Sequence, residues 1–149
     1  MLHHLDQALP GEAQAVLEKA FANNMIKDDQ KDRTNRLLNM AKGRADTDRK
    51  GLPQFDAEAA KNKAGEASVK TGEVYYGVGD YQNAVKLIQA GIEKGQVKHL
   101  DEAYVYLGLS QAQLKNGPEA KKAFEKLKSV PNMSPRVLKL WELYADRQV

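Results

Sequence analysis

An internal repeat with a period of 36 residues constrains the fold of this 149-residue chain more than any other feature. The residue pairs that recur at this offset are mostly small or apolar: Thr71 and Leu107, Gly72 and Gly108, Ala84 and Ala120, Ile88 and Phe124, and Gly91 and Leu127. A constant offset across such positions indicates duplicated structural units that stack on one another. The chain is therefore expected to be built from repeats.

A further copy of the same pattern lies upstream. The segment Glu12–Phe21 resembles Asn83–Ile92 at an offset of 71 residues, which is close to two periods. This spacing predicts a degenerate copy between them, over residues 28–63.

Each well-preserved copy has the signature of two helices joined by a tight turn. Gly72 and Gly108 lie in the middle of predicted helices, where glycine costs ~1 kcal/mol relative to alanine. A helix accepts that cost where a second helix must approach closely. Gly79 and Asp80 are typical of a helix stop followed by an N-cap, and Pro118 is typical of a first helical turn.

Over residues 65–131 these motifs resemble the tetratricopeptide repeat family, with some Sel1-like character. The resemblance rests on Gly72-x-x-Tyr75-Tyr76-Gly77-Val78-Gly79-Asp80-Tyr81-x-x-Ala84 and on Tyr104-x-x-Leu107-Gly108, followed by Ala120-x-x-x-Phe124 and Pro131. The sequence departs from the family pattern at Ser68 and Thr71 in one copy and at Gln111 in the next. The period is also slightly longer than the family's ~34 residues.

The resemblance implies an all-α fold: a right-handed α-solenoid of antiparallel helix pairs that ends in a C-terminal capping helix. One domain over residues 1–149 would contain repeats at 9–26 (partial), 28–63 (degenerate), 65–95 and 101–131, and a cap at 134–147. Helices are expected over residues 9–24, 30–43, 50–63, 66–78, 81–94, 101–115 and 118–129.

The first predicted repeat lacks its own first helix, unless residues 2–8 supply a short one. Because a solenoid cannot leave the face of a helix unpaired, either another chain covers it or the sequence is part of a longer protein. The first residues lack the pattern of a signal peptide. The sequence as given is thus expected to be cytoplasmic, and exported or periplasmic if a leader is missing.

In the implied solenoid the first helix of each pair lines a concave groove that binds a partner helix or peptide. The resemblance places these residues in the groove: Glu66, Val69, Glu73, Tyr76 and Gly77 from one repeat, and Glu102, Val105, Leu109, Ala112 and Gln113 from the next. The alternative for Tyr76, Val105 and Leu109 is packing against neighbouring helices. The acidic flank of this groove favours a neutral or basic apolar segment over an acidic peptide.

The predicted capping helix leaves two leucines in question. Val137, Leu138, Trp141, Tyr144 and Ala145 form the stripe expected to pack on the preceding repeat. Leu140 and Leu143 fall outside that stripe. They are either partly exposed residues of a simple cap or a surface for self-association.

Composition and motifs argue against catalysis. Hydrophobic residues make up 42% of the chain and charged residues 29%, with a net charge of +3, and there are no cysteines. His3, His4 and His99 do not have the spacing of a metal site, and neither a nucleophile motif nor a phosphate-binding loop occurs. No cofactor or metal is expected, no nucleic acid, and no membrane insertion, because no apolar run approaches ~18 residues.

The sequence therefore predicts a protein that is not an enzyme and that binds a protein or peptide as a scaffold or adaptor. One alternative is a structural solenoid end that associates with itself as a homodimer or packs on the rest of a longer chain. Another is an RNA-binding helical repeat, which would need a regular base-reading pair in each repeat. No such pair is visible.

Overall fold

The computed structural model describes residues 10–131 and 133–148, and every regular element in this part of the chain is helical. The expected all-α class is thus confirmed. The elements are α1 (Pro10–Ala22), a 3-10 turn η2 (Asp28–Gln30), α2 (Lys31–Lys61), α3 (Glu66–Gly77), α4 (Tyr81–Lys94), α5 (Leu100–Gln113), α6 (Gly117–Glu125), a 3-10 turn η3 (Lys126–Ser129) and α7 (Pro135–Gln148).

The two well-preserved copies form the helix pairs α3–α4 and α5–α6, as predicted. Gly72 lies against α4, where an added Cβ would come within 2.6 Å of Ile88 Cγ1. Gly108 lies in the same way against the ring of Phe124 on α6. Ile88 and Phe124 are the matching positions of the two copies and are both fully buried. The repeated glycines therefore let the two helices of each pair approach closely.

The turn between α3 and α4 also matches the prediction. Gly79 has a φ of 84°, in the left-handed region that glycine adopts without strain. The side chain of Asp80 then accepts a hydrogen bond from the backbone N–H of Asn83 at 3.2 Å, which makes it the N-cap of α4.

The predicted helix pair over residues 30–43 and 50–63 is wrong, because α2 is one continuous helix of 31 residues. Pro53 lies inside it without ending it. The N-terminal part of α2 packs against α1 and the C-terminal part against α3, so tertiary contacts support the helix on both sides of the proline. Packing on both parts offsets the backbone hydrogen bond that Pro53 cannot donate.

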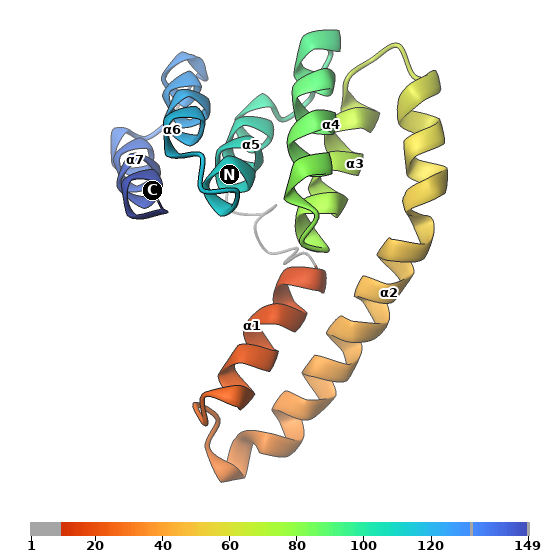
Figure 1. The fold of residues 1–149 in the computed structure, drawn as a ribbon, viewed down its shortest axis with the longest axis vertical. Helices are drawn as coiled ribbons and strands as arrows, with labels where there is room; N and C mark the ends of the chain where they lie inside the picture. Colours follow the sequence, from red (N-terminus) through yellow and green to blue (C-terminus); the bar gives the residue numbers. More distant parts are fainter. Residues whose placement is uncertain (1–9, 132, 149) are drawn as a thin grey trace.

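Helix α1 also differs from its prediction. It runs from Pro10 to Ala22 and packs along the N-terminal half of α2, where Lys42 forms an ion pair with Glu18 on α1 at 3.2 Å. The start of α1 abuts the end of α3, since Gly11 lies directly against the carbonyl of Gly77. Figure 1 shows the result: α1 and the first half of α2 project from the other helices as a two-helix arm. Residues 2–8, which could have formed a further helix, lie outside the described residues.

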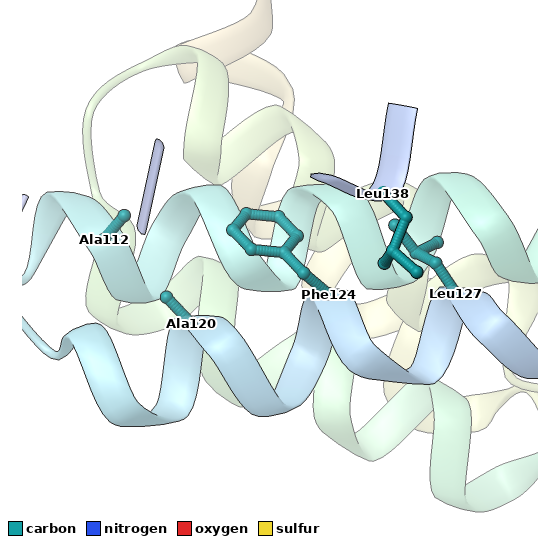
Figure 2. Close-up of a cluster of buried hydrophobic side chains, with 5 residues drawn as sticks. All are labelled: Ala112, Ala120, Phe124, Leu127 and Leu138. Atoms are coloured by element: carbon teal, nitrogen blue, oxygen red, sulfur yellow. The ribbon is translucent and has the colours of Figure 1, made fainter. Parts of the chain in front are cut away.

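The last helix, α7, packs on the preceding helix pair, as the sequence predicted. Leu138 on α7 is buried with Phe124 and Leu127 of the preceding repeat (Figure 2). The ring of Trp141 stacks on Phe124, with centroids 5.5 Å apart and planes 19° apart. Tyr144 packs against the same cluster, and Val137 is more exposed than the predicted stripe implies. The side chain of Ala145 is outside the described part.

Candidate functional site

The groove residues predicted on α3 are mostly buried. Val69 is 1% exposed, Tyr76 5% and Glu73 8%, and Gly77 is buried as well. Helix α3 is covered by α2, α4 and α5, so only a narrow stripe reaches the surface. In that stripe Lys70 is exposed, and Glu66, Ala67, Val74 and Tyr75 are partly buried. The predicted Val69 and Glu73 each lie one residue before a position that reaches the surface. A shift of one residue rotates a helical position by about 100°, which is enough to turn a groove position into a core position.

The buried side chains of α3 hold the helices together. Val69 packs in a cluster with Ile88 and Leu107. The hydroxyl of Tyr76 donates a hydrogen bond to Glu12 Oε1 on α1 at 3.0 Å, and its ring meets that of Tyr106 at a centroid distance of 5.2 Å. Burial, followed by the nearby Glu12 carboxylate, raises the pKa of Tyr76 far above its ordinary value. This tyrosine therefore joins α1, α3 and α5 rather than offering a surface.

The prediction is closer on α5. Gln113 is exposed, and Glu102, Val105 and Leu109 are partly buried, whereas Ala112 belongs to the core. Val105 and Leu109 also pack against the cluster around Phe124 and thus serve the alternative role that the sequence left open for them. The exposed stripe of α5 therefore runs from Glu102 through Leu109 to Gln113.

An ion-pair chain joins the stripes of α3 and α5. Lys70 Nζ lies 3.1 Å from a carboxylate oxygen of Glu73 and 3.7 Å from one of Glu102. Burial raises the pKa of Glu73 despite the attraction of Lys70. Glu66, also predicted to line the groove, instead accepts a hydrogen bond from the backbone N–H of Lys98 at 2.8 Å.

Beside this chain of charges lies a hollow of about 280 Å³ between α2 and α3. We call it the α2–α3 hollow, and its lining residues are Phe55, Glu58, Ala67, Lys70, Thr71 and Val74. The hydroxyl of Tyr75 braces the two helices nearby by donating a hydrogen bond to Asp56 Oδ2 at 2.6 Å. That hydrogen bond is the main cause that raises the pKa of Tyr75 to about 12.

Sequence reasoning missed Phe55 and Glu58 because it placed them in a short second helix of a degenerate pair. The signal that could have identified them is a helical periodicity that continues through residues 31–61. Leu37 and Phe55 are 18 residues apart, as are Met40 and Glu58, and ~18 residues make five turns of an α-helix. Treating residues 31–61 as one helix would have placed all four side chains on one flank.

Searches against protein-family models, curated proteins and solved structures give no match to this chain. The site therefore has to be interpreted from its own residues.

Among residues 10–131 and 133–148, no group of three or more His, Asp or Glu side chains lies close enough to hold a metal ion. His3 and His4 lie outside this part of the chain, and His99 is in the turn before α5. None of the helices that the structure describes has the length and apolar character needed to cross a membrane. The chemistry of the α2–α3 hollow is that of an apolar depression edged by charges.

Proposed function

We propose that this chain is a non-catalytic protein-interaction module that binds an apolar segment of a partner, a helix or a peptide, along the α2–α3 hollow. The observation that carries the proposal is the hollow itself, whose apolar lining lies beside the ion pairs of Lys70 with Glu73 and Glu102. We also propose that α3–α6 and α7 form a right-handed solenoid of the tetratricopeptide type. The repeated Gly72–Ile88 and Gly108–Phe124 contacts support this proposal.

The size of the hollow supports a peptide anchor over a small-molecule site. Its volume of about 280 Å³ lies just below the range of ~300–1,000 Å³ that is typical of small-molecule pockets. Phe55, Ala67 and Val74 supply an apolar floor for one large side chain. The rest of a partner segment would extend over α5 toward Leu109 and Gln113, in the manner of a helix in a groove.

Charge selects the partner segment. Glu58, Glu66 and Glu102 edge the surface, and the one lysine among the lining residues, Lys70, is already engaged by Glu73 and Glu102. Because Glu66, Glu73 and Glu102 surround the single Lys70, an acidic segment would meet an excess of negative charge there and be repelled, whereas a neutral or basic segment would not be. The expected partner therefore combines apolar anchors with lysine or arginine.

The proposal can be tested with two fluorescent 15-residue helical peptides that share a leucine stripe and carry either lysines or glutamates. Fluorescence anisotropy should show that the lysine peptide binds the wild-type protein and that the glutamate peptide does not displace it from the α2–α3 hollow. Val74→Lys should weaken binding of the lysine peptide by more than tenfold, because it fills the hollow and adds a like charge. Val137→Lys, at a half-exposed valine of α7, is the matched control and should leave binding unchanged. Equal binding to wild type and Val74→Lys would contradict the proposal.

A second candidate function is self-association through α7. Leu140 and Leu143 are both exposed on this last helix, as the sequence predicted. They could pack against the same helix of a second copy, so that the chain acts as a structural end piece. This role requires only that two copies meet, and the mass in solution tests it.

A further inference from the structure

The two-helix arm carries a second surface, separate from the α2–α3 hollow. We call it the arm face, and it consists of Val16 on α1 and Arg33, Leu37, Met40 and Arg44 on α2. The four α2 residues are spaced i, i+4, i+7 and i+11, which places them on one flank of the helix.

The ion pair between Glu18 and Lys42 fixes the opposite edge of the arm. Val16 precedes Glu18 by two residues, and Met40 precedes Lys42 by two. Two residues correspond to a rotation of about 200° on a helix, so both side chains turn away from the ion-paired edge. Val16 and Met40 therefore share the other edge of the arm.

The arm face is apolar at its centre and open to solvent. Val16 is 67% exposed, Met40 54% and Leu37 47%. Single exposed apolar residues need no explanation, but three on the same edge of a projecting hairpin form a patch of the kind that marks interaction sites. Leu38 and Ala41, one position further round α2, already fill the seam with α1, so the patch is not needed to hold the arm together.

Two arginines, Arg33 and Arg44, frame this patch. Three other basic residues of the arm form ion pairs, namely Lys31 with Asp28, Lys42 with Glu18, and Arg49 with Asp46. Within the described part of the chain, no carboxylate pairs with Arg33 or Arg44, and both side chains are exposed. Each guanidinium is thus available to bind a carboxylate with two parallel hydrogen bonds.

We propose that the arm face binds an acidic amphipathic helix of a partner protein. Leucine-type side chains of such a helix would cover Val16, Leu37 and Met40, and glutamates or aspartates on its flanks would pair with Arg33 and Arg44. The thioether of Met40 adapts its shape to different apolar partners, which suits such a surface. This charge preference is opposite to that of the α2–α3 hollow, so the inference does not rest on the proposed function.

A second copy of the chain fits the arm face less well. Parallel pairing of two α2 helices would place Arg33 against Arg33. Antiparallel pairing centred on Met40 would place Arg44 against Arg36. Like charges that face each other across an interface oppose association, so self-pairing is disfavoured in both orientations.

Nucleic acid is also a poorer fit than an acidic helix. Asp32 and Asp48 lie on α2 within one turn of Arg33 and Arg44 and would repel a continuous line of phosphates. The apolar centre of the arm face would have no base edges or sugars to match. Discrete carboxylates on an amphipathic helix avoid both problems.

The test uses an 18-residue fluorescent peptide with a leucine stripe flanked by glutamates, and a matched peptide with lysines in place of the glutamates. By anisotropy, the glutamate peptide should bind the full wild-type chain. The double variant Arg33→Glu/Arg44→Glu should lose that binding by more than tenfold. When Val74→Lys also blocks the α2–α3 hollow, the arm variant should bind the lysine peptide, whereas Val74→Lys alone should not. The double variant Arg136→Glu/Arg147→Glu on α7 makes the same change in net charge elsewhere and should behave like wild type. All four positions are exposed, so the fold should be retained, and circular dichroism checks this.

Three results would overturn the inference. The first is that the arm variant binds the glutamate peptide as tightly as the wild type does. The second is a wild-type dimer, seen by light scattering, that the arm variant dissociates, since the arm face would then bind a second copy. The third is a mixed-sequence RNA that binds wild type, fails to bind the arm variant, and competes with the glutamate peptide.

Discussion

Adding one methyl group at Gly108 should destabilise the fold, although the same change stabilises an ordinary helix. On a solvent-exposed helix, alanine in place of glycine contributes ~1 kcal/mol of stability. At Gly108 the new Cβ would overlap three ring atoms of Phe124, which is fully buried and cannot swing into solvent. Overpacking of this kind costs ~1–3 kcal/mol and can exceed that where the neighbour is held in place. We therefore expect Gly108→Ala to lower the free energy of unfolding by ~1–2 kcal/mol.

The matched control is Gly43→Ala in α2. An added Cβ there meets nothing within 4 Å, so this variant should gain ~0.5–1 kcal/mol. Urea unfolding followed by circular dichroism measures both variants. With a slope of ~1–3 kcal/mol per molar urea, the two midpoints should move in opposite directions by several tenths molar. In a protein that already carries Phe124→Leu, the ring that the new methyl group would overlap is absent. Gly108→Ala should therefore lower the free energy of unfolding by less in that background than in the wild type. If Gly108→Ala is as stabilising as Gly43→Ala, the close approach of α5 and α6 is not what the glycine provides.

Three further predictions follow from individual contacts. Because burial raises the folded-state pKa of Glu73, wild type should lose stability relative to Glu73→Gln as the pH rises from 4.5, the ordinary pKa of glutamate, through the raised value, and the urea midpoints of the two should diverge over that interval; a constant difference contradicts this. Tyr75→Phe should lower the free energy of unfolding by ~1–2 kcal/mol through loss of the hydrogen bond to Asp56. That difference should persist below pH 10.0, the ordinary pKa of tyrosine, and vanish as the pH passes about 12. If α7 mediates self-association, Leu143→Glu should abolish a concentration-dependent increase of mass in light scattering, and an unchanged mass excludes α7 as the interface.

The sequence predicted the helix pairs α3–α4 and α5–α6 because each contains a signal that acts locally. Glycine at a close contact, glycine and aspartate at a turn, and proline at a helix start each determine nearby backbone conformation. The repeat then reinforces these signals, since Gly72 and Gly108 meet equivalent partners. The capping role of α7 was predictable for a related reason, because its apolar stripe has a clear helical period.

The N-terminal half was not predictable in the same way. Gly43, Gly51 and Pro53 all weaken a helix locally, which favours two short helices over one long one. What keeps α2 continuous is packing against α1 and α3, and these contacts join segments that are distant in the sequence. Local preference and tertiary packing conflict here, and packing prevails.

The candidate groove residues on α3 are mostly buried, whereas those on α5 other than Ala112 are exposed or partly buried. The family pattern predicts which residues of a helix face its paired helix. It does not predict which other helices cover the rest of that helix's surface. On α3 the side that includes Tyr76 faces α1 and α5, through its hydrogen bond to Glu12 and its ring contact with Tyr106. Glu12 and Tyr76 are 64 residues apart, and no local sequence pattern predicts a contact over that separation.

The unbroken helix α2 also holds the arm face and the α2–α3 hollow at a fixed distance from each other. Leu37 on the arm face and Phe55 in the α2–α3 hollow are 18 residues apart, which is ~27 Å along a helix with no net rotation between them. Two segments of one ligand, joined by a linker long enough to span that distance, could occupy both surfaces at once and gain avidity from the second contact. A linker too short to span that distance would leave one of the two surfaces empty, and the gain in avidity would be lost while each surface stayed intact.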